Sequence, residues 1–390
     1  MTSAPGARRL AATVAFEHVT KRYPGRDAGR PNAVEDLSLE VPAGQICVLV
    51  GPSGCGKTTS LKMVNRLIEP TSGRILIDGQ DAAVRDVTEL RRSIGYVIQQ
   101  VGLFPHQTIG ENVGTVPRLL GWPEARRVAR SEELLALVGM DPAIYRDRYP
   151  SQLSGGERQR VGVARALAAD PPVMLMDEPF GAVDPIVRER LQNEFLRLQA
   201  NLAKTILFVT HDIDEAIKMG DVVAVMDAGG RLAQLGTPGE ILTGPASDFV
   251  ARFVGADRGL KRLALSRVRD LVMGMAVTAR LGEDAAAARD RAFSDASGYL
   301  LLLDELDRPI GWIWRAAIPV SGPLPADLAV PASPFLDPET TLKDALSMLL
   351  GADVQAGIVV NARGAFMGLV TAEMIADRLR PGSPSESGRT

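Results

Sequence analysis

The sequence predicts an α/β fold in which a large domain with a mostly parallel sheet precedes a smaller α/β region. Continuous apolar runs at Ile46–Val50, Val173–Met176 and Ile206–Val209 are typical of strands that are buried on both faces. Helix-rich stretches separate these runs, as a parallel sheet requires. The length of 390 residues indicates two or three domains.

Composition narrows the class of protein. The formal net charge of -3 gives no general reason to expect nucleic acid as a partner. Cys47 and Cys55 are the two cysteines, and no metal-ligand spacing accompanies them, so a reducing cytosolic compartment fits best. No stretch offers about twenty uninterrupted apolar residues, so attachment to a membrane is expected to depend on a partner.

The elements of the large domain follow from pattern. Residues 12–50 alternate apolar and polar positions between turn residues, which predicts antiparallel strands before the first buried run. A helix is predicted over Lys57–Leu67, and residues 106–170 are rich in helix. Asp177 and His211 directly follow the second and third buried runs, at the edge where open parallel sheets bind ligands.

The smaller region contains a faint internal repeat. Tyr299–Leu303 with 308–313 is echoed by Ala356–Val360 with 364–370. Each copy is predicted to be a strand, a turn, a strand and then a helix, so the copies form a pair of small α/β units.

A glycine-rich segment directly follows the first buried strand and begins the next helix. It consists of Gly51, Pro52, Ser53, Gly54, Cys55, Gly56, Lys57, Thr58 and Thr59. Its glycines allow backbone N–H groups to turn toward phosphate oxygens, and the helix N-terminus adds a favourable dipole. We expect Lys57 to reach the β and γ phosphates, Thr58 to bind Mg²⁺ and Thr59 to contact the α phosphate. The segment predicts an ATP site.

Two acidic residues end the second buried run. Asp177 suits a magnesium ligand that acts through water. Glu178 projects differently, and we expect it to orient and deprotonate the attacking water. Taken alone, without the glycine-rich segment, Asp-Glu-Pro could equally be an ordinary turn at the end of a strand.

A second glycine-bearing segment occupies residues 153–160, Leu-Ser-Gly-Gly-Glu-Arg-Gln-Arg. Ser154 is predicted to N-cap the helix that carries Glu157–Leu167, and Gly155 and Gly156 leave the first amides of this helix bare. This is an anion site without a lysine, so we expect one nucleotide to lie between two protein surfaces. An ordinary helix start is the alternative.

Together these segments resemble the ATPase subunit of an ABC transporter over residues 12–245. The resemblance implies a P-loop NTPase with a RecA-like core, an antiparallel β subdomain and a helical subdomain at about 101–165. Gln99 matches the Q-loop glutamine of that family, Asp184 its D-loop aspartate and His211 its switch histidine.

The resemblance also implies roles. Glu178, His211 and Gln99 are the predicted catalytic residues, and Thr58, Gln99 and Asp177 the predicted magnesium ligands. Tyr23 matches the aromatic residue that stacks on adenine. Ser154, Gly156 and Gln159 of a second copy are expected to hold the γ-phosphate side of ATP in a head-to-tail dimer.

Residues 94–106 and 214–221 look like those of ATPases that drive import of glycine betaine, carnitine, choline and proline, which also carry tandem CBS modules. The resemblance implies osmoprotectant uptake together with a transmembrane permease and an extracytoplasmic solute-binding protein, at the cytoplasmic face of a bacterial membrane. Import of another small solute, such as an amino acid or polyamine, and a soluble ABC ATPase outside transport are the alternatives.

The predicted C-terminal organisation is a linker at 246–258, a tandem CBS-like region at 259–382 and a disordered tail at 383–390. The two CBS-like copies are expected at about 259–320 and 325–382. Thr371 supplies the hydroxyl of the nucleotide-binding CBS motif, but Met374 stands where its acid belongs, which does not favour adenosine binding.

Three surfaces have two interpretations each. The basic residues Arg258, Lys261, Arg262, Arg267 and Arg269 contact anionic lipid or form a solvated helix face. Leu103 and Phe104 dock a membrane subunit or pack against the helical subdomain. Trp312 and Trp314 share one face of a strand by alternation, which favours core or dimer packing over a ligand cage.

Overall fold

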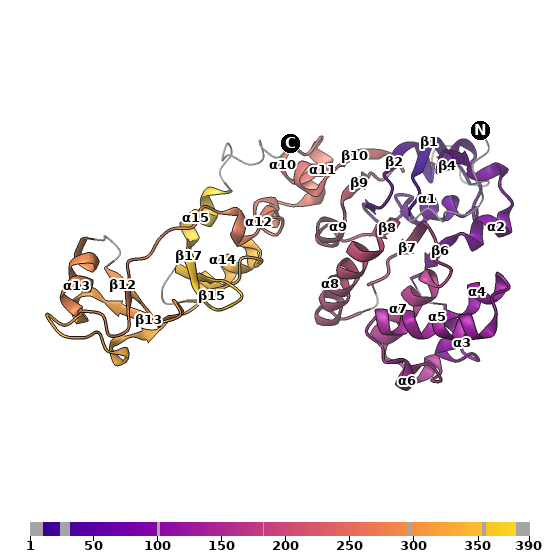
Figure 1. Cartoon of the computed structure of the whole chain (residues 1–390). Coiled ribbons are helices and arrows are strands. Elements are labelled where there is room, and N and C mark those ends of the chain that lie inside the picture. Colours follow the sequence, from indigo (N-terminus) through magenta and orange to yellow (C-terminus); the bar gives the residue numbers. More distant parts are fainter. Residues whose placement is uncertain are drawn as a thin grey trace, which may run out of the picture. The chain divides into compact units, whose positions relative to one another are not determined.

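The computed structural model describes residues 11–23, 32–99, 102–181, 183–294, 298–352 and 356–379. The chain divides into two compact units, Met1–Gly255 and Ala256–Thr390 (Figure 1). The division falls inside the segment that the sequence predicts as a linker. The predicted disordered tail, 383–390, lies outside the described residues.

A six-stranded sheet forms the centre of the first unit. Its order is β10 (Leu232–Gly236), β9 (Val222–Met226), β3 (Ile46–Val50), β8 (Thr205–Thr210), β7 (Val173–Asp177) and β6 (Ile94–Val97). All neighbours pair in parallel except β10, which is an antiparallel edge strand. Every residue of β3, β7 and β8 is buried, so the parallel sheet predicted from the three apolar runs is confirmed.

A second, antiparallel sheet in the order β2 (Val34–Val41), β1 (Val14–Lys21), β4 (Ser72–Ile77) and β5 (Gln80–Asp81) confirms the predicted antiparallel strands. Helix α1 (Lys57–Val64) contributes Leu61, Met63 and Val64 to the apolar core that joins the two sheets. The helix ends before the predicted Leu67 because Arg66 adopts a left-handed conformation with φ 53°.

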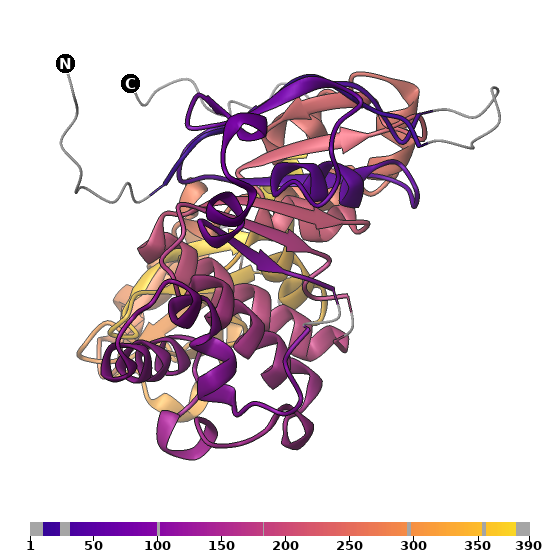
Figure 2. The same cartoon turned by 90° about the vertical axis from the view of Figure 1, so that its right-hand side faces the viewer.

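Helices form the remaining layers of this unit, and Figure 2 shows α3–α7 gathered on one side of the strands. They are α2 (Val87–Arg92), α3 (Ile109–Val113), α4 (Thr115–Leu119), α5 (Glu124–Leu137), α6 (Pro142–Tyr145), α7 (Gly155–Leu167), α8 (Pro185–Leu202), α9 (Ile213–Met219), α10 (Pro238–Thr243) and α11 (Asp248–Val254), with 3₁₀ turns at Ala82–Val84 and Pro150–Gln152. Val250 and Val254 of α11 pack into the core of the sheet, so this core extends past residue 245.

The second unit contains two small sheets, one built on the hairpin β12–β13 and the other on β16–β17. The first sheet has β11 (Thr278–Arg280), β12 (Tyr299–Leu303), β13 (Pro309–Trp314) and β14 (Val330–Pro331), and the second has β15 (Phe335–Leu336), β16 (Ala356–Val360) and β17 (Phe366–Thr371). Its helices are α12 (Arg258–Leu263), α13 (Ala285–Ser294), α14 (Leu342–Leu350) and α15 (Ala372–Asp377), with 3₁₀ turns at Val268–Asp270, Arg315–Ala317 and Ala326–Leu328.

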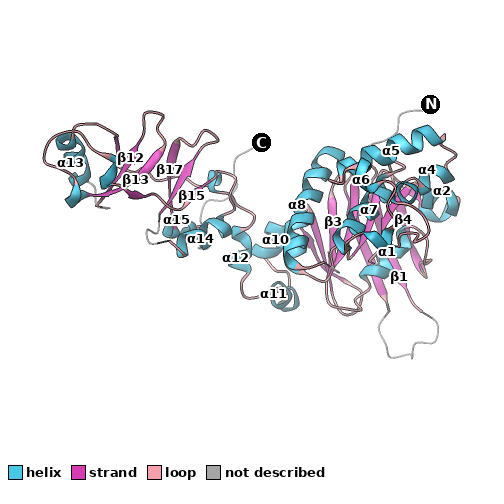
Figure 3. Cartoon of the chain, turned by 90° about the horizontal axis from the view of Figure 1, so that it is seen from below, coloured by secondary structure: helices cyan, strands magenta, loops and turns pink. Residues whose placement is uncertain are grey.

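The internal repeat is visible in these sheets. Each hairpin pairs its first strand in parallel with a short preceding strand, and each has a register shift at its last pairs, Leu302/Leu303 and Val359/Val360. Figure 3 shows the strands of the two sheets side by side, and Trp312 packs with Ile358 between them. The predicted helix after the hairpin forms only in the second copy, because a 3₁₀ turn at Arg315–Ala317 takes its place in the first.

The buried amide of Asn112, on α3, fixes the loop that follows β6. Its Oδ1 accepts the Phe104 N–H at 2.7 Å. Its Nδ2 donates to the carbonyls of Phe104, Gln107 and Thr108 at 3.1, 3.1 and 2.9 Å. One side chain with no exposed surface therefore satisfies several backbone groups of this loop.

We expect Asn112→Asp to destabilise the first unit. A carboxylate keeps the acceptor but loses the donor, and it brings negative charge against carbonyl oxygens at a buried position, which costs about 1–3 kcal/mol or more. Urea unfolding followed by circular dichroism measures this loss. Asn193→Asp, at an exposed position of α8, is the matched control, and equal midpoints for the two variants would contradict the role of Asn112.

Candidate nucleotide-binding and hydrolysis site

The glycine-rich loop between β3 and α1 is shaped by contacts that exclude a larger residue. Gly56 has φ 95°, and a Cβ at this position would lie 2.1 Å from the Ala33 carbonyl oxygen. Gly54 also adopts a positive φ, but it has no neighbour within 4 Å that a Cβ would meet. The loop therefore packs closely on one side and remains open on the other, as a cradle for an anion requires.

Lys57 lies inside this cradle with only 6% of its surface exposed. Its Nζ donates to the carbonyl oxygens of Gly51 at 2.7 Å and Pro52 at 3.0 Å. These partners are neutral, so a phosphate offers the ammonium a stronger, charge-assisted hydrogen bond. Cys55 is fully buried beneath the loop, and burial raises the pKa of its thiol, so only its backbone is placed to meet a phosphate. Ser53 is exposed and Thr59 is half-buried.

Thr58 and Asp177 come together from α1 and β7. The Thr58 hydroxyl donates to Asp177 Oδ1 at 2.8 Å. Burial raises the pKa of Asp177, and this hydrogen bond and the nearby Lys62 and Lys57 oppose the shift. A hydroxyl and a carboxylate are oxygen ligands of the type that Mg²⁺ prefers. Among the described residues no group of three His, Cys, Asp or Glu side chains is placed to hold a metal.

Glu178 is held between the other predicted catalytic residues. Gln99 Nε2 donates to Glu178 Oε2 at 3.0 Å, and His211 Nδ1 lies 3.2 Å from Glu178 Oε1. The backbone of Glu178 has φ 44°, which is uncommon for a residue with a side chain, and its N–H donates to the Val209 carbonyl at 3.0 Å. Because the Gln99 amide is directed at Glu178, a role of Gln99 as a magnesium ligand stays a prediction.

A buried pair that has no motif in the sequence links α8 to α9. Gln192 Nε2 donates to Glu215 Oε1 at 2.9 Å, and both residues are less than one-tenth exposed. Burial raises the pKa of Glu215, while hydrogen bonds from Thr210 and Gln192 oppose the shift. Because α9 follows His211 and α8 follows Asp184, this pair connects two predicted site segments.

The second glycine-bearing segment begins α7 as predicted. Ser154 is the N-cap, and it exchanges hydrogen bonds with Glu157 at 3.3 and 2.7 Å in a capping box. Tyr145 donates to the Glu157 carboxylate at 2.7 Å, which lowers the pKa of Glu157. Gly155 has open space around it, and Gly156 is covered by Val187.

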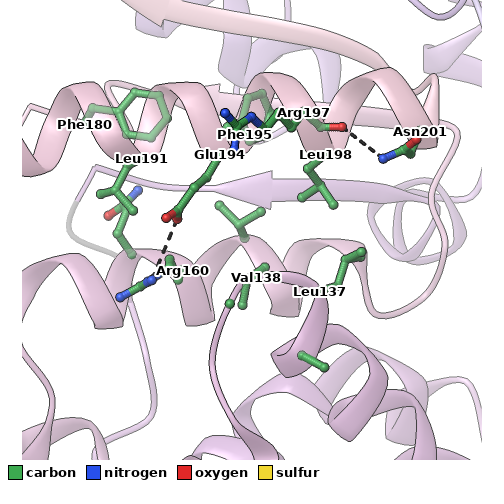
Figure 4. A pocket seen from close by; sticks show the side chains of 14 residues that line it. Leu137, Val138, Arg160, Phe180, Leu191, Glu194, Phe195, Arg197, Leu198 and Asn201 are labelled. Atoms are coloured by element: carbon green, nitrogen blue, oxygen red, sulfur yellow. Dashed lines mark hydrogen bonds and ion pairs between the residues drawn. The ribbon is translucent and has the colours of Figure 1, made fainter. Parts of the chain in front are cut away.

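Gln159 is buried, with 4% of its surface exposed, and its Nε2 has no hydrogen-bond partner among the described residues. It lines a cavity between α5, α7 and α8. Figure 4 shows this cavity. Ser154, by contrast, is exposed at the start of the same helix. The contact of Gln159 with nucleotide held by a second copy stays a prediction.

The remaining predicted residues lie at element ends or in loops. Asp184 is the N-cap of α8 and accepts the Val187 N–H at 3.1 Å. Tyr23 follows β1, with the Lys21 ammonium 5.3 Å from the centroid of its ring.

Of the apolar pair in the loop after β6, Leu103 packs against the core, whereas Phe104 is 41% exposed. The expected exposure therefore applies to Phe104 alone.

The fold and this site define a P-loop ATPase. The family model for ABC transporter matches residues 34–181. The chain is 45% identical over 370 residues to the osmoprotectant import ATP-binding protein OsmV of Salmonella typhimurium, which covers 95% of this chain and 97% of that protein. It belongs to the ATP-binding proteins of ABC transporters.

Two further comparisons support this conclusion. The glycine betaine/carnitine/choline transport ATP-binding protein OpuCA of Bacillus subtilis is 54% identical over 264 residues, 67% of this chain and 68% of that protein. The dimeric structure of a post-hydrolysis state of the ATP-binding cassette MJ0796, bound to ADP and Pi, has a TM-score of 0.52 and 32% identity, and covers 58% of this chain and 98% of that chain.

The chain is therefore an ATP-binding subunit that hydrolyses ATP, and subunits of this class dimerise and work with transmembrane permease components. In the part of the chain that the structure describes, no helix combines the length and apolar character needed to cross a bilayer.

We expect Gln192→Glu to make stability depend steeply on pH. Glu215 already has a pKa above its ordinary value of 4.5, and a second buried carboxylate facing it raises the pKa of the pair further. A group whose pKa is higher in the folded protein stabilises the fold at pH values below its unfolded-state pKa. This stabilisation is lost as the pH rises through its folded-state pKa. Each tenfold decrease of the acid dissociation constant on folding lowers the free energy of unfolding at high pH by about 1.4 kcal/mol.

Urea unfolding at several pH values from 4.5 upward measures this effect. Asn193→Asp adds a carboxylate at the neighbouring exposed position and controls for charge alone. A loss of stability in Gln192→Glu that does not grow with pH would show that the two side chains do not meet.

Proposed function

We propose that this chain is the ATP-hydrolysing subunit of an importer for osmoprotectants such as glycine betaine, carnitine, choline or proline. The observation that carries the proposal is the likeness to OsmV, named as an osmoprotectant import protein, which extends over both units of the chain. OpuCA of Bacillus subtilis and the glycine betaine uptake protein YehX of Escherichia coli, 49% identical over 260 residues, support the same cargo class.

In the proposed reaction, ATP phosphates replace the Gly51 and Pro52 carbonyls as partners of Lys57. Thr58 and Asp177 hold Mg²⁺, which neutralises phosphate charge when it is bound. Glu178 orients the attacking water and takes its proton, while Gln99 and His211 on either side keep the carboxylate in place. The hydrogen bond from Gln99 to Glu178 and the 3.2 Å distance between His211 Nδ1 and Glu178 Oε1 support this arrangement of roles.

The γ-phosphate is proposed to join two copies of the chain. The exposed start of α7, with Ser154 and Gly155, is an anion site that has no lysine of its own. A phosphate held by Lys57 of one copy and by this helix start of another favours the closed pair, and cleavage removes that preference. The ADP-bound dimer of MJ0796 supports a paired arrangement.

Other partners belong to the same proposal. A permease is proposed to contact the loop held by Asn112, at the exposed Phe104, and an extracytoplasmic protein is proposed to deliver the solute to that permease. This places the subunit at the cytoplasmic face of the membrane. Contact with anionic lipid would depend on Arg258 and Arg262, because Arg267 and Arg269 both pair with Glu339 and Lys261 pairs with Asp257.

We expect Glu178→Gln to bind ATP normally and to hydrolyse it at least about 100-fold more slowly, because it removes the base while keeping shape. The nucleotide is then not consumed, so the variant is expected to accumulate as a dimer with Mg-ATP. Phosphate release and light scattering measure the two effects. Glu189→Gln, on an exposed part of α8, is the control, and wild-type turnover in Glu178→Gln would refute the assigned base.

The cargo is tested by uptake in cells. Deleting the gene is expected to reduce uptake of labelled glycine betaine, carnitine, choline or proline under salt stress, and wild-type protein but not Glu178→Gln is expected to restore it. Unchanged uptake of all four solutes would remove osmoprotectants as cargo. The solute that binds the cognate extracytoplasmic protein would then identify the true one, an amino acid or a polyamine being the first to examine.

A further inference from the structure

A cavity of about 340 Å³ lies apart from the glycine-rich loop, between the end of α5, α7 and α8. Figure 4 shows α8 above it, with Leu198 and Glu194 directed toward α7. Its lining on α8 runs from Leu191 to Asn201, which corresponds to about 15 Å of helix. The cavity is therefore elongated, and its volume is within the range of small-molecule sites.

Most of the wall is apolar. Val138 at the end of α5, Val163 on α7 and Leu191, Phe195 and Leu198 on α8 all line it. Each of these side chains is less than one-tenth exposed, so they form a preformed apolar surface. Such a surface suits the hydrocarbon part of a ligand.

Two hydrogen-bond donors in this wall have no partner in the part of the chain that the structure describes. Gln159 is 4% exposed and its Nε2 is buried without an acceptor, and Arg160 Nε is buried without one as well. Buried donors of this kind are normally satisfied, so they indicate a missing acceptor. Both residues line the same cavity, so a ligand bound there would supply the missing acceptor.

The charge of the lining favours an anion. Arg160 and Arg197 outnumber the single carboxylate, Glu194. Glu194 Oε1 accepts a 2.9 Å hydrogen bond from Arg190 Nε, whereas the distance from its Oε2 to Arg160 Nη1 is 3.7 Å. The Arg160 guanidinium is therefore only loosely paired, and a second carboxylate would give it a closer partner.

We propose that this cavity binds an amphiphile composed of an aliphatic chain and a carboxylate. The chain lies along α8 against the apolar wall, and the carboxylate accepts from Gln159 and Arg160. The bound molecule contacts both α7, which begins at Ser154, and α8, which begins after Asp184. Small polar osmoprotectants do not match an apolar wall, so this ligand is distinct from the proposed cargo.

The test uses the purified full-length chain and isothermal titration with decanoate, kept below its micelle concentration, and with decanol as the uncharged analogue. We expect saturable binding of one decanoate per chain. Gln159→Leu and Arg160→Met are each expected to weaken decanoate binding by about tenfold, because each removes one hydrogen bond to a charged group. The affinity for decanol is expected to stay nearly unchanged in both variants.

Two more variants complete the test. Gln45→Leu makes the same chemical change outside the cavity and is expected to bind decanoate like the wild type. Leu198→Trp fills the cavity and is expected to abolish binding of both probes, with folding checked by circular dichroism. The proposal is overturned if the wild type does not bind decanoate saturably, or if Gln159→Leu and Arg160→Met both bind it as tightly as the wild type.

Discussion

Parallel pairing of β3, β8 and β7 is the constraint on which the site depends. The register places Val50 opposite Thr210 and Asp177 opposite Val209, so the three strands end at the same edge of the sheet. Three segments therefore meet at this edge, each directly after its strand: the glycine-rich loop, the acidic pair after β7 and the histidine after β8. No long loop is needed to bring them together. This is the crevice at the carboxyl ends of strands where α/β sheets bind ligands.

The charged groups at this edge are only partly compensated. Asp177 is 7% exposed, and its one direct hydrogen bond comes from a hydroxyl, so burial still raises its pKa. The Glu178 carboxylate instead accepts from the Gln99 amide and lies 3.2 Å from the His211 imidazole. Binding of a cation would therefore stabilise the Asp177 carboxylate, whereas the Glu178 carboxylate already has partners that orient it. These different environments support the metal-binding role proposed for Asp177 and the proton-accepting role proposed for Glu178.

Sequence reasoning succeeded where local pattern and tertiary structure agree. Buried strands, the Ser154 cap and the repeated hairpins all follow from period and from turn residues. Tertiary packing decides other features. Gln159 lies four residues before Val163, on the same helical face, and both are buried. The contact with nucleotide that the family resemblance implies for Gln159 stays a prediction.

Other features had no local signature. Leu103 packs inward while Phe104 beside it is exposed, and nothing in their sequence separates them. The hydrogen bond between Gln192 and Glu215 joins residues 23 positions apart, so only the packing of α8 on α9 brings them into contact. The left-handed turn at Arg66 is equally unmarked, because arginine has no preference for that conformation.

Lys57 already donates to two carbonyls of its own loop, so its proposed contact with nucleotide would be an exchange of partners. Removing this ammonium would deprive the nucleotide of that proposed ligand and would also leave the Gly51 and Pro52 carbonyl oxygens without this donor. A defect in ATP affinity after such a change thus combines lost attraction with a relaxed cradle. Loss of the lysine consequently overstates what its charge alone contributes to binding.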